Sequence, residues 1–399
     1  MKHKNIPKGY KDSPLGIIPK EWEVKTIGEV CDIHVGKDLN LNSYSKRCDN
    51  THIYPVYSNT VDANGWYGGY YNFEEYRGNC VTVVGRGVGL GTAFYRDKGF
   101  GAIGRLLVLY SDKCDAKYLA EYINGKVEIF VESAAIPQLT GKQIANYRIA
   151  VPPIEEQRKI SEILSVWDEA IEKQTKLINA LTRRKRALTQ LLLTGNKRLP
   201  NFTESWKKVS YHEILKEIKR TLKWNDDELY RLISVKRRSG GIFERGSLYG
   251  KDIKTKNLRP VYEGDFLISK MQIVHGASGL TTPEFNNAKV SGSYLALIAK
   301  DKKLLNMNYL NWWSKTPQFY HQTFISSYGV HIEKMTFDLD SLMSLNIKLP
   351  PIDEQIAIIK VLNIADYKIK LAQKYLDALH NQKHGLMQQL LTGNKRVKT

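Results

Sequence analysis

Apolar residues recur at alternating intervals of four and three along two segments of the chain, which is the spacing of a coiled-coil seam. The first seam runs through Ile160, Leu164, Trp167, Ile171, Gln174, Ile178, Leu181, Lys185, Leu188 and Leu192. The second seam runs through Ile358, Leu362, Ala365, Ile369, Ala372, Leu376, Leu379, Lys383, Leu386 and Leu390. The few polar seam positions can set register and orientation. The pattern predicts two long helices with matching seams, the alternative being two ordinary core helices in separate domains.

The two helical segments are copies of one phrase. Residues 150–198 (AVPPIEEQ…LLTGNKR) align without a gap with residues 348–396 (KLPPIDEQ…LLTGNKR), at a constant offset of 198 residues. Each copy opens with two prolines and acidic residues, which suit a first helical turn and its dipole. Each copy ends with a glycine followed by Lys-Arg, a helix stop with cations at the negative end. The repeat indicates a duplicated half-protein.

The duplication also predicts how the helices run. Residues 199–348 leave the end of the first helix and return at the start of the second, and the termini of a domain often lie close together. The helices should therefore be antiparallel and pair within one chain, as a rod of about 58 Å with a globular domain at each end. We expect a domain over 1–150, a helix over 151–198, a second domain over 199–348 and a second helix over 349–399.

The two globular segments resemble each other weakly. GNCVTVVGRG (78–87) matches GDFLISKMQI (264–273), and YLAEYI (118–123) matches YLNWWS (309–314). Short apolar runs predict buried strands at Val81–Val84, Leu106–Tyr110, Phe266–Ser269 and Tyr294–Ala299. The pattern also predicts helices over residues 116–130 and 307–320. The fold class is therefore α+β (α/β-like), with two globular domains joined by two long helices in an intramolecular antiparallel coiled coil. A shared order of elements with different surface residues would serve two different recognition tasks.

Charge points to a polyanionic partner. The 399 residues carry a formal net charge of +19, and all four segments are basic, so the charge is not confined to a tail. Positive charge spread over a whole protein favours nucleic acid. No apolar run is long enough for a membrane span, and the N-terminus lacks the apolar core of a secretory signal, so we expect a cytoplasmic protein. The four cysteines form no CxxC pair, which disfavours zinc and disulfides.

The sequence lacks the common catalytic motifs. It has no GxxxxGK[ST], HExxH or GxSxG, and no Asn/Asp-Pro-Pro-Tyr/Phe tetrapeptide of adenine methyltransferases. The glycine run Gly85–Gly91 does not fit GxGxxG and is better explained as a turn or a loop that lets backbone approach a ligand. We therefore expect a chain with no catalytic residues, no metal and no cofactor of its own.

Two unlike domains separated by two copies of PP-I-[DE]-E-Q…LLTG-N-K-R resemble the DNA specificity (S) subunit of type I restriction-modification enzymes. The likeness is specific in the helices (Pro152 to Arg198 and Pro350 to Arg396) and looser in the domains. It implies that each globular part is a target recognition domain that reads one half of a split, asymmetric DNA site. It further implies that the helices space the half-sites and dock two methyltransferase subunits, which bind S-adenosylmethionine and methylate adenine. Restriction/translocase subunits, which use ATP, would complete the complex.

The residues that touch DNA are not supplied by this resemblance, because recognition domains vary. Each domain must offer cations to phosphates and side chains to base edges, and arginine is the likeliest guanine reader. The candidates are Lys37, Arg47, Arg86 and Arg105 in the first domain, and Lys236, Arg237 and Arg238 in the second, with Lys254, Lys256 and Lys270 as secondary choices. For most of them the alternative is a solvated surface cation.

Two other functions are compatible with a basic two-domain chain. One is a stand-alone bivalent DNA-binding regulator, and the other is a scaffold whose basic domains bind RNA. Neither accounts for two copies of the PPIEEQ…LLTGNKR phrase.

Overall fold

The structure is a computed structural model that describes residues 6–130 and 137–398. The chain divides into two compact units, Met1–Lys176 with Lys374–Thr399, and Leu177–Gln373. No helix among the described residues is long and apolar enough to cross a membrane.

The first unit is built on two four-stranded sheets. The first sheet has the order β4 (Asp32–Val35), β11 (Leu107–Tyr110), β8 (Cys80–Val83), β9 (Ala93–Arg96), and its neighbours are antiparallel. The second has the order β10 (Gly101–Ala102), β6 (Tyr54–Tyr57), β7 (Trp66–Tyr71), β5 (Tyr44–Ser45), with β10 parallel to β6. Helix α2 (Ala116–Lys126) packs on β8 and β9. The strands predicted at Val81–Val84 and Leu106–Tyr110 are thus confirmed as β8 and β11.

Smaller elements complete the first unit. Strands β3 (Glu23–Thr26) and β12 (Arg148–Val151) pair just before the first long helix, and β1 (Tyr10–Ser13) pairs with β2 (Gly16–Pro19). The short elements are α1 (Ile27–Val30), η1 (Leu41–Ser43), η2 (Asp62–Gly65) and α3 (Gly141–Ala145).

The second unit repeats most of this topology. Its first sheet, β14-β21-β18-β19, has the same order as β4-β11-β8-β9, and β13 pairs with β24 as β3 does with β12. In its second sheet, β16-β15-β20-β17, strand β20 is parallel to β15 as β10 is to β6, but the fourth strand β17 pairs with β20, whereas β5 pairs with β7. The strands are β13 (Lys207–Ser210), β14 (Leu215–Glu217), β15 (Leu229–Val235), β16 (Ile242–Tyr249), β17 (Leu258–Pro260), β18 (Phe266–Ser269), β19 (Ser278–Leu280), β20 (Lys289–Ser291), β21 (Tyr294–Ala299), β22 (Ser327–Tyr328), β23 (Thr336–Phe337) and β24 (Asn346–Leu349). The helices are α5 (Tyr211–Ile214), η3 (Gly250–Asp252), η4 (Ile273–His275), η5 (Pro283–Phe285), α6 (Met307–Trp313), α7 (Pro317–Ile325), η6 (Ile332–Lys334) and α8 (Leu339–Ser344). The shared order of elements expected from sequence is confirmed except for β5 and β17, which lie at opposite ends of the second sheet.

Two helix predictions were wrong in their extent. The single helix expected over 307–320 is two helices, α6 and α7, because Thr316 caps α7 through Phe319 N and Pro317 fills its first position. A proline there lacks the N–H that a continuous helix would need. The helix expected over 116–130 ends at Lys126, where Val127 adopts extended backbone.

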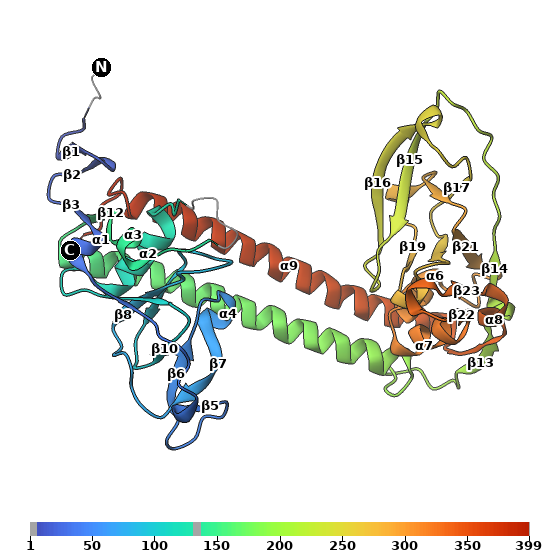
Figure 1. The fold of residues 1–399 in the computed structure, drawn as a ribbon. Coiled ribbons are helices and arrows are strands. Elements are labelled where there is room, and N and C mark those ends of the chain that lie inside the picture. The colour runs from blue at the N-terminus through green and yellow to red at the C-terminus, as the bar shows by residue number, and fades with distance from the viewer. Residues whose placement is uncertain (1–5, 131–136, 399) are drawn as a thin grey trace. The chain divides into compact units, whose positions relative to one another are not determined.

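The long helices are α4 (Ile154–Leu193) and α9 (Ile352–Leu390), which lie side by side and antiparallel (Figure 1). Within the first unit the beginning of α4 packs near the end of α9, and within the second unit the end of α4 packs near the beginning of α9. The predicted fold class, two α+β domains joined by a helix pair, is confirmed. None of the apolar seam candidates is exposed: Ile160, Leu164, Trp167, Ile171, Ile178, Leu181, Leu188, Ile358, Leu362, Ile369, Leu376, Leu379 and Leu386 are buried or half-buried.

The lysines that interrupt the seam pair across it. Lys185 Nζ lies 2.6 Å from Asp366 Oδ1, and Lys383 Nζ lies 2.7 Å from Asp168 Oδ1. The same offset of 198 residues relates the two lysines and the two aspartates. A shift of one helix along the other would break both pairs, so these polar positions favour a single register.

The start of each repeat is bound to the end of the other through two equivalent clusters, which we call the clamps. In the first clamp, buried Glu156 accepts hydrogen bonds from Arg396 Nε (2.6 Å) and Nη2 (3.0 Å) and from Trp22 Nε1 (2.9 Å). In the second clamp, buried Glu354 accepts the same three bonds from Arg198 Nε (2.8 Å), its Nη2 (2.7 Å) and Trp206 Nε1 (2.9 Å). Each glutamate begins one repeat and each arginine ends the other.

The clamps correct one expectation from sequence. Glu156 and Glu354 lie in first helical turns, where acids suit the dipole, but burial against an arginine is their main interaction. Likewise Arg198 and Arg396 point to the opposite repeat instead of capping their own helix. Hydrogen bonding to Glu156 raises the pKa of Arg396, which keeps this arginine charged.

Candidate nucleic-acid interface

Lys37 and Arg105 are brought together in the first unit by backbone hydrogen bonds. Lys37 follows β4, and its carbonyl accepts from Gly104 N at 2.8 Å. Arg105 N donates to Gly36 O at 3.0 Å. Both side chains are exposed, so the two cations extend from adjoining loops.

Arg86 is linked to the same loops through Asn59. The side chain of Asn59 donates to Gly104 O and accepts from Gly85 N at 2.7 Å. Gly85 itself leaves no room for a side chain, because a Cβ there would stand 2.9 Å from Arg105 O. Lys37, Arg86 and Arg105 thus form one group, which we call the first-unit cluster.

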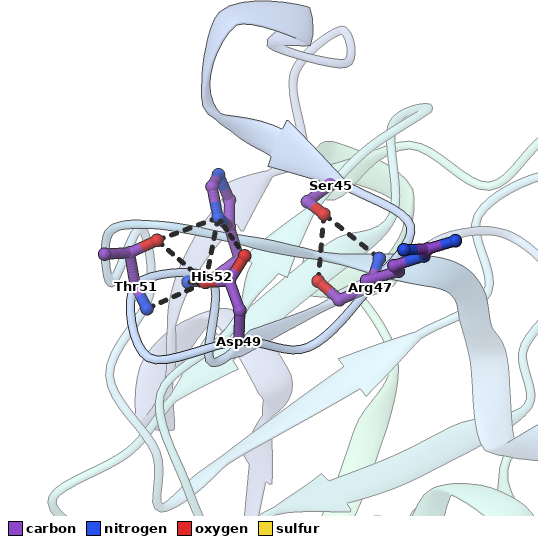
Figure 2. Close-up of polar contacts among 5 residues, drawn as sticks. All are labelled: Ser45, Arg47, Asp49, Thr51 and His52. Atoms are coloured by element: carbon purple, nitrogen blue, oxygen red, sulfur yellow. Dashed lines mark hydrogen bonds and ion pairs between the residues drawn. The ribbon is translucent and has the colours of Figure 1, made fainter.

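Arg47 lies outside the hydrogen bonds that join this cluster, on the loop that follows β5. Ser45 Oγ donates to Arg47 O at 2.9 Å and accepts from Arg47 N at 3.0 Å, which fixes the backbone. Figure 2 shows the Arg47 side chain extending away from Ser45 and from the turn at Asp49. Hydrogen bonds from His52 N and from Thr51 hold the pKa of Asp49 well below its usual range, so this loop also carries a fixed negative charge.

Lys236, Arg237 and Arg238 form the turn of the β15–β16 hairpin. The turn rests on the loop after β18: Arg238 N donates to His275 O at 2.6 Å, and Ser239 N donates to Gly276 O at 2.9 Å. The three cationic side chains are exposed. The hairpin therefore presents cations from a backbone that is held at its tip.

Two of the second-unit candidates already have acidic partners. Arg237 Nη2 lies 3.0 Å from Glu333 Oε2, and Lys256 Nζ lies 2.8 Å from Asp226 Oδ1. The hydrogen bond from Lys256 lowers the pKa of Asp226. To contact DNA, each of these two side chains would have to leave its acidic partner and bind a phosphate or a base instead.

The remaining candidates differ in exposure. Lys254 is exposed in the loop between η3 and β17, whereas Lys270 is half-buried at the end of β18. Within residues 6–130 and 137–398, no hydrogen bond or ion pair engages the side chains of Lys37, Arg47, Arg86, Arg105, Arg238, Lys254 or Lys270. Their contact with DNA stays a prediction. The described part of the chain also offers no group of three or more His, Cys, Asp or Glu that could hold a metal ion.

Sequence reasoning missed Asn59 and the pairing of loops in each unit. In the second unit the β15–β16 turn rests on the loop after β18, and in the first unit the β6–β7 loop contacts the loop after β8 through Asn59. The pairs correspond, because β6–β7 and β15–β16 are the hairpins whose first strand pairs in parallel with a later strand, β10 or β20. No local signal marks Asn59, since its partners lie 26 and 45 residues further along the chain.

Comparison with known proteins agrees with this architecture. Residues 19–183 match the family described as Type I restriction modification DNA specificity domain. A putative type I specificity subunit of Mycoplasma pneumoniae is 31% identical over 201 residues, which cover 49% of this chain and 62% of that protein, so the chain spans less than two thirds of that relative. The type I restriction enzyme MjaVIII specificity subunit of Methanocaldococcus jannaschii is 25% identical over 96% of this chain and 94% of its own length.

A solved structure has the same fold. The S subunit of a type I restriction-modification system from M. genitalium superposes with a TM-score of 0.60 over 92% of this chain and 96% of that chain, at 14% identity. The family match covers most of the first globular domain and most of α4, and the relative from Methanocaldococcus jannaschii extends the likeness over both copies of the repeat. Residues 19–183 are therefore similar to the DNA specificity domain of type I restriction-modification systems, and nearly the whole chain is similar to a type I specificity subunit.

Proposed function

We propose that this chain is the non-catalytic subunit that gives a type I restriction-modification complex its DNA specificity, by binding a bipartite, asymmetric site on double-stranded DNA. The observation that carries the proposal is the presence of two units that share the order of one four-stranded sheet and have unlike cationic loops. The first unit offers the first-unit cluster, and the second offers the β15–β16 turn. Two domains with a common fold and different surfaces can each recognise a different half-site.

The helix pair would serve as the spacer between the half-sites and as the docking surface. Val166 on α4 and Ile364 on α9 are equivalent across the repeat, and both are exposed, 66% and 47%. Leu177 and Tyr375 form a second exposed equivalent pair. Apolar side chains presented to solvent at equivalent positions fit two copies of one protein partner. We propose that this partner is the adenine methyltransferase subunit.

The other components of the complex follow from this assignment. S-adenosylmethionine and ATP would be bound by the methyltransferase and restriction/translocase subunits, and this chain would work in the cytoplasm, where the DNA is. Its task would be to place those subunits on the site.

The proposal is tested by stoichiometry. The full chain, co-expressed with a type I methyltransferase subunit and purified through a tag on this chain, should give a complex with two methyltransferase copies in native mass spectrometry. Purification of the chain free of any methyltransferase, together with sequence-specific DNA binding at a single contiguous site, would instead support a stand-alone regulator.

A further inference from the structure

Two of the candidate DNA-binding arginines occupy backbone conformations that favour glycine. Among the described residues, eight non-glycine residues have a positive φ, and four of these are asparagines, which tolerate the left-handed region. Two of the others are Arg105, with φ 68°, and Arg238, with φ 57°. A long side chain gains nothing from this conformation, so its presence there calls for another reason.

Arg105 is a central residue of a tight turn. Leu106 N donates to Ile103 O at 3.3 Å, and the residues between them, Gly104 and Arg105, have φ 67° and 68°. Positive φ at both central residues is the property of type I′ turns, where the second central position is usually glycine. In this turn Gly104 is the first central residue, and Arg105 occupies the second central position.

Arg238 lies in a tight turn of the same kind in the second unit, at the first central position. Gly240 N donates to Arg237 O at 3.2 Å, and the residues between them, Arg238 and Ser239, have φ 57° and 52°. The N–H groups of both central residues are also bound, to His275 O and Gly276 O. The equivalent loop of the first unit has Ala63 and Asn64 at positive φ, so the cation at this place belongs to the second unit alone.

Both turns therefore fix the direction in which an arginine leaves the backbone. Each turn is bound to a neighbouring loop, each arginine is exposed, and neither guanidinium has a hydrogen bond or ion pair among the residues that the structure describes. A side chain with a fixed origin and a free planar fork loses less freedom on binding than one from a mobile loop. The fork matches the O6 and N7 atoms of guanine in the major groove.

We propose that Arg105 and Arg238 are specificity-determining residues, each reading a guanine in one of the two half-sites. This inference rests on the proposed function. It separates these two arginines from the other candidate cations, whose task would be to contact phosphates. Because the two turns lie at different places in the shared fold, the two units would read their guanines from different loops.

The experiment uses the full chain in complex with its methyltransferase and a library of randomised double-stranded DNA. Bound sequences are selected and read for the wild type and for R105G, R238G, R105K and R238K. For R105G we expect a motif that has lost one guanine in one half-site, with binding to the original site reduced about 10-fold or more. R238G should do the same in the other half-site. Lysine keeps the charge and loses the planar fork, so R105K and R238K should keep salt-dependent affinity and show a weaker preference for the guanine.

Thermal unfolding separates this role from a structural one. Glycine suits positive φ, so R105G and R238G should melt no lower than the wild type while specificity is lost. The matched control is N79G, which changes an exposed residue of the first unit with φ 56° and should leave the motif unchanged. An N79G motif relaxed as much as that of R105G would overturn the inference.

The outcomes distinguish the inference from the function on which it rests. A wild-type complex that selects no split motif refutes both. A split motif that both glycine variants leave unchanged refutes the inference alone, as does a single glycine variant that weakens both half-sites equally.

Discussion

Replacing Glu354 with glutamine tests how strongly the clamps join the two repeats. The Glu354 side chain is fully buried and accepts three hydrogen bonds, one at Oε1 from Arg198 Nε and two at Oε2 from Arg198 Nη2 and Trp206 Nε1. Glutamine has the same size but only one acceptor oxygen. With that oxygen in the place of Oε2, its amide nitrogen would face the N–H of Arg198.

The expected loss follows from this geometry. One hydrogen bond to a charged group disappears and two donors are left facing each other, which costs about 2 kcal/mol of unfolding free energy. The cost stays below the 3–5 kcal/mol typical of breaking a fully buried ion pair, because the Arg198 side chain is 27% exposed and can be hydrated. The first clamp has the same three bonds, so E156Q should lose a similar amount.

The assay is equilibrium urea unfolding of the full chain, followed by circular dichroism. The matched control is E155Q, because Glu155 is next to Glu156 on α4 and is exposed, and its ion-pair partner among the described residues is Arg158 on the same helix. This surface pair is worth well under 1 kcal/mol. Since the two clamps share no residue, the double variant E156Q/E354Q should lose roughly the sum of the single losses. An E354Q chain as stable as E155Q would refute the idea that the clamps hold the repeats together.

Two further predictions concern the helix pair. Burial raises the pKa of Glu121 above its ordinary value of 4.5, although Lys383 acts in the opposite direction. A carboxyl whose pKa is raised by folding stabilises the protein at low pH, and this stability is lost as the pH rises through the folded-state pKa. The wild type should therefore lose stability relative to E121Q from about pH 4 upward, and parallel stability curves would contradict this. V166E and I364E place a charge in equivalent exposed apolar positions, so each variant should bind one methyltransferase copy instead of two in native mass spectrometry. A variant that keeps both copies would show that its position lies outside the docking surface.

The long helices could be predicted from sequence to within a few residues. A helix was expected over 151–198 and α4 spans Ile154–Leu193, because a heptad period, a proline start and a glycine stop all act locally. The break between α6 and α7 was also signalled locally, by Thr316 before Pro317, but the apolar pattern outweighed it.

Interactions between distant residues could not be read in the same way. Glu156 and Arg396 are separated by 240 positions, and a helix-dipole explanation of each was sufficient on its own. Only the repeat hinted that the end of one copy meets the start of the other. The candidate cations were chosen by residue type, which says nothing of an acidic partner such as Glu333 for Arg237, or of the left-handed backbone at Arg105.

The central claim is that two unlike domains read two half-sites whose separation is set by the helix pair. It is tested most directly by sequencing methylated adenines in DNA from cells that carry the methyltransferase with either the wild-type chain or a variant with four residues inserted after Gln174 and after Ala372. We expect a split motif with a fixed gap for the wild type, and the same half-sites with a different gap for the variant. A contiguous motif, or a gap that the insertion leaves unchanged while methylation persists, would contradict the claim.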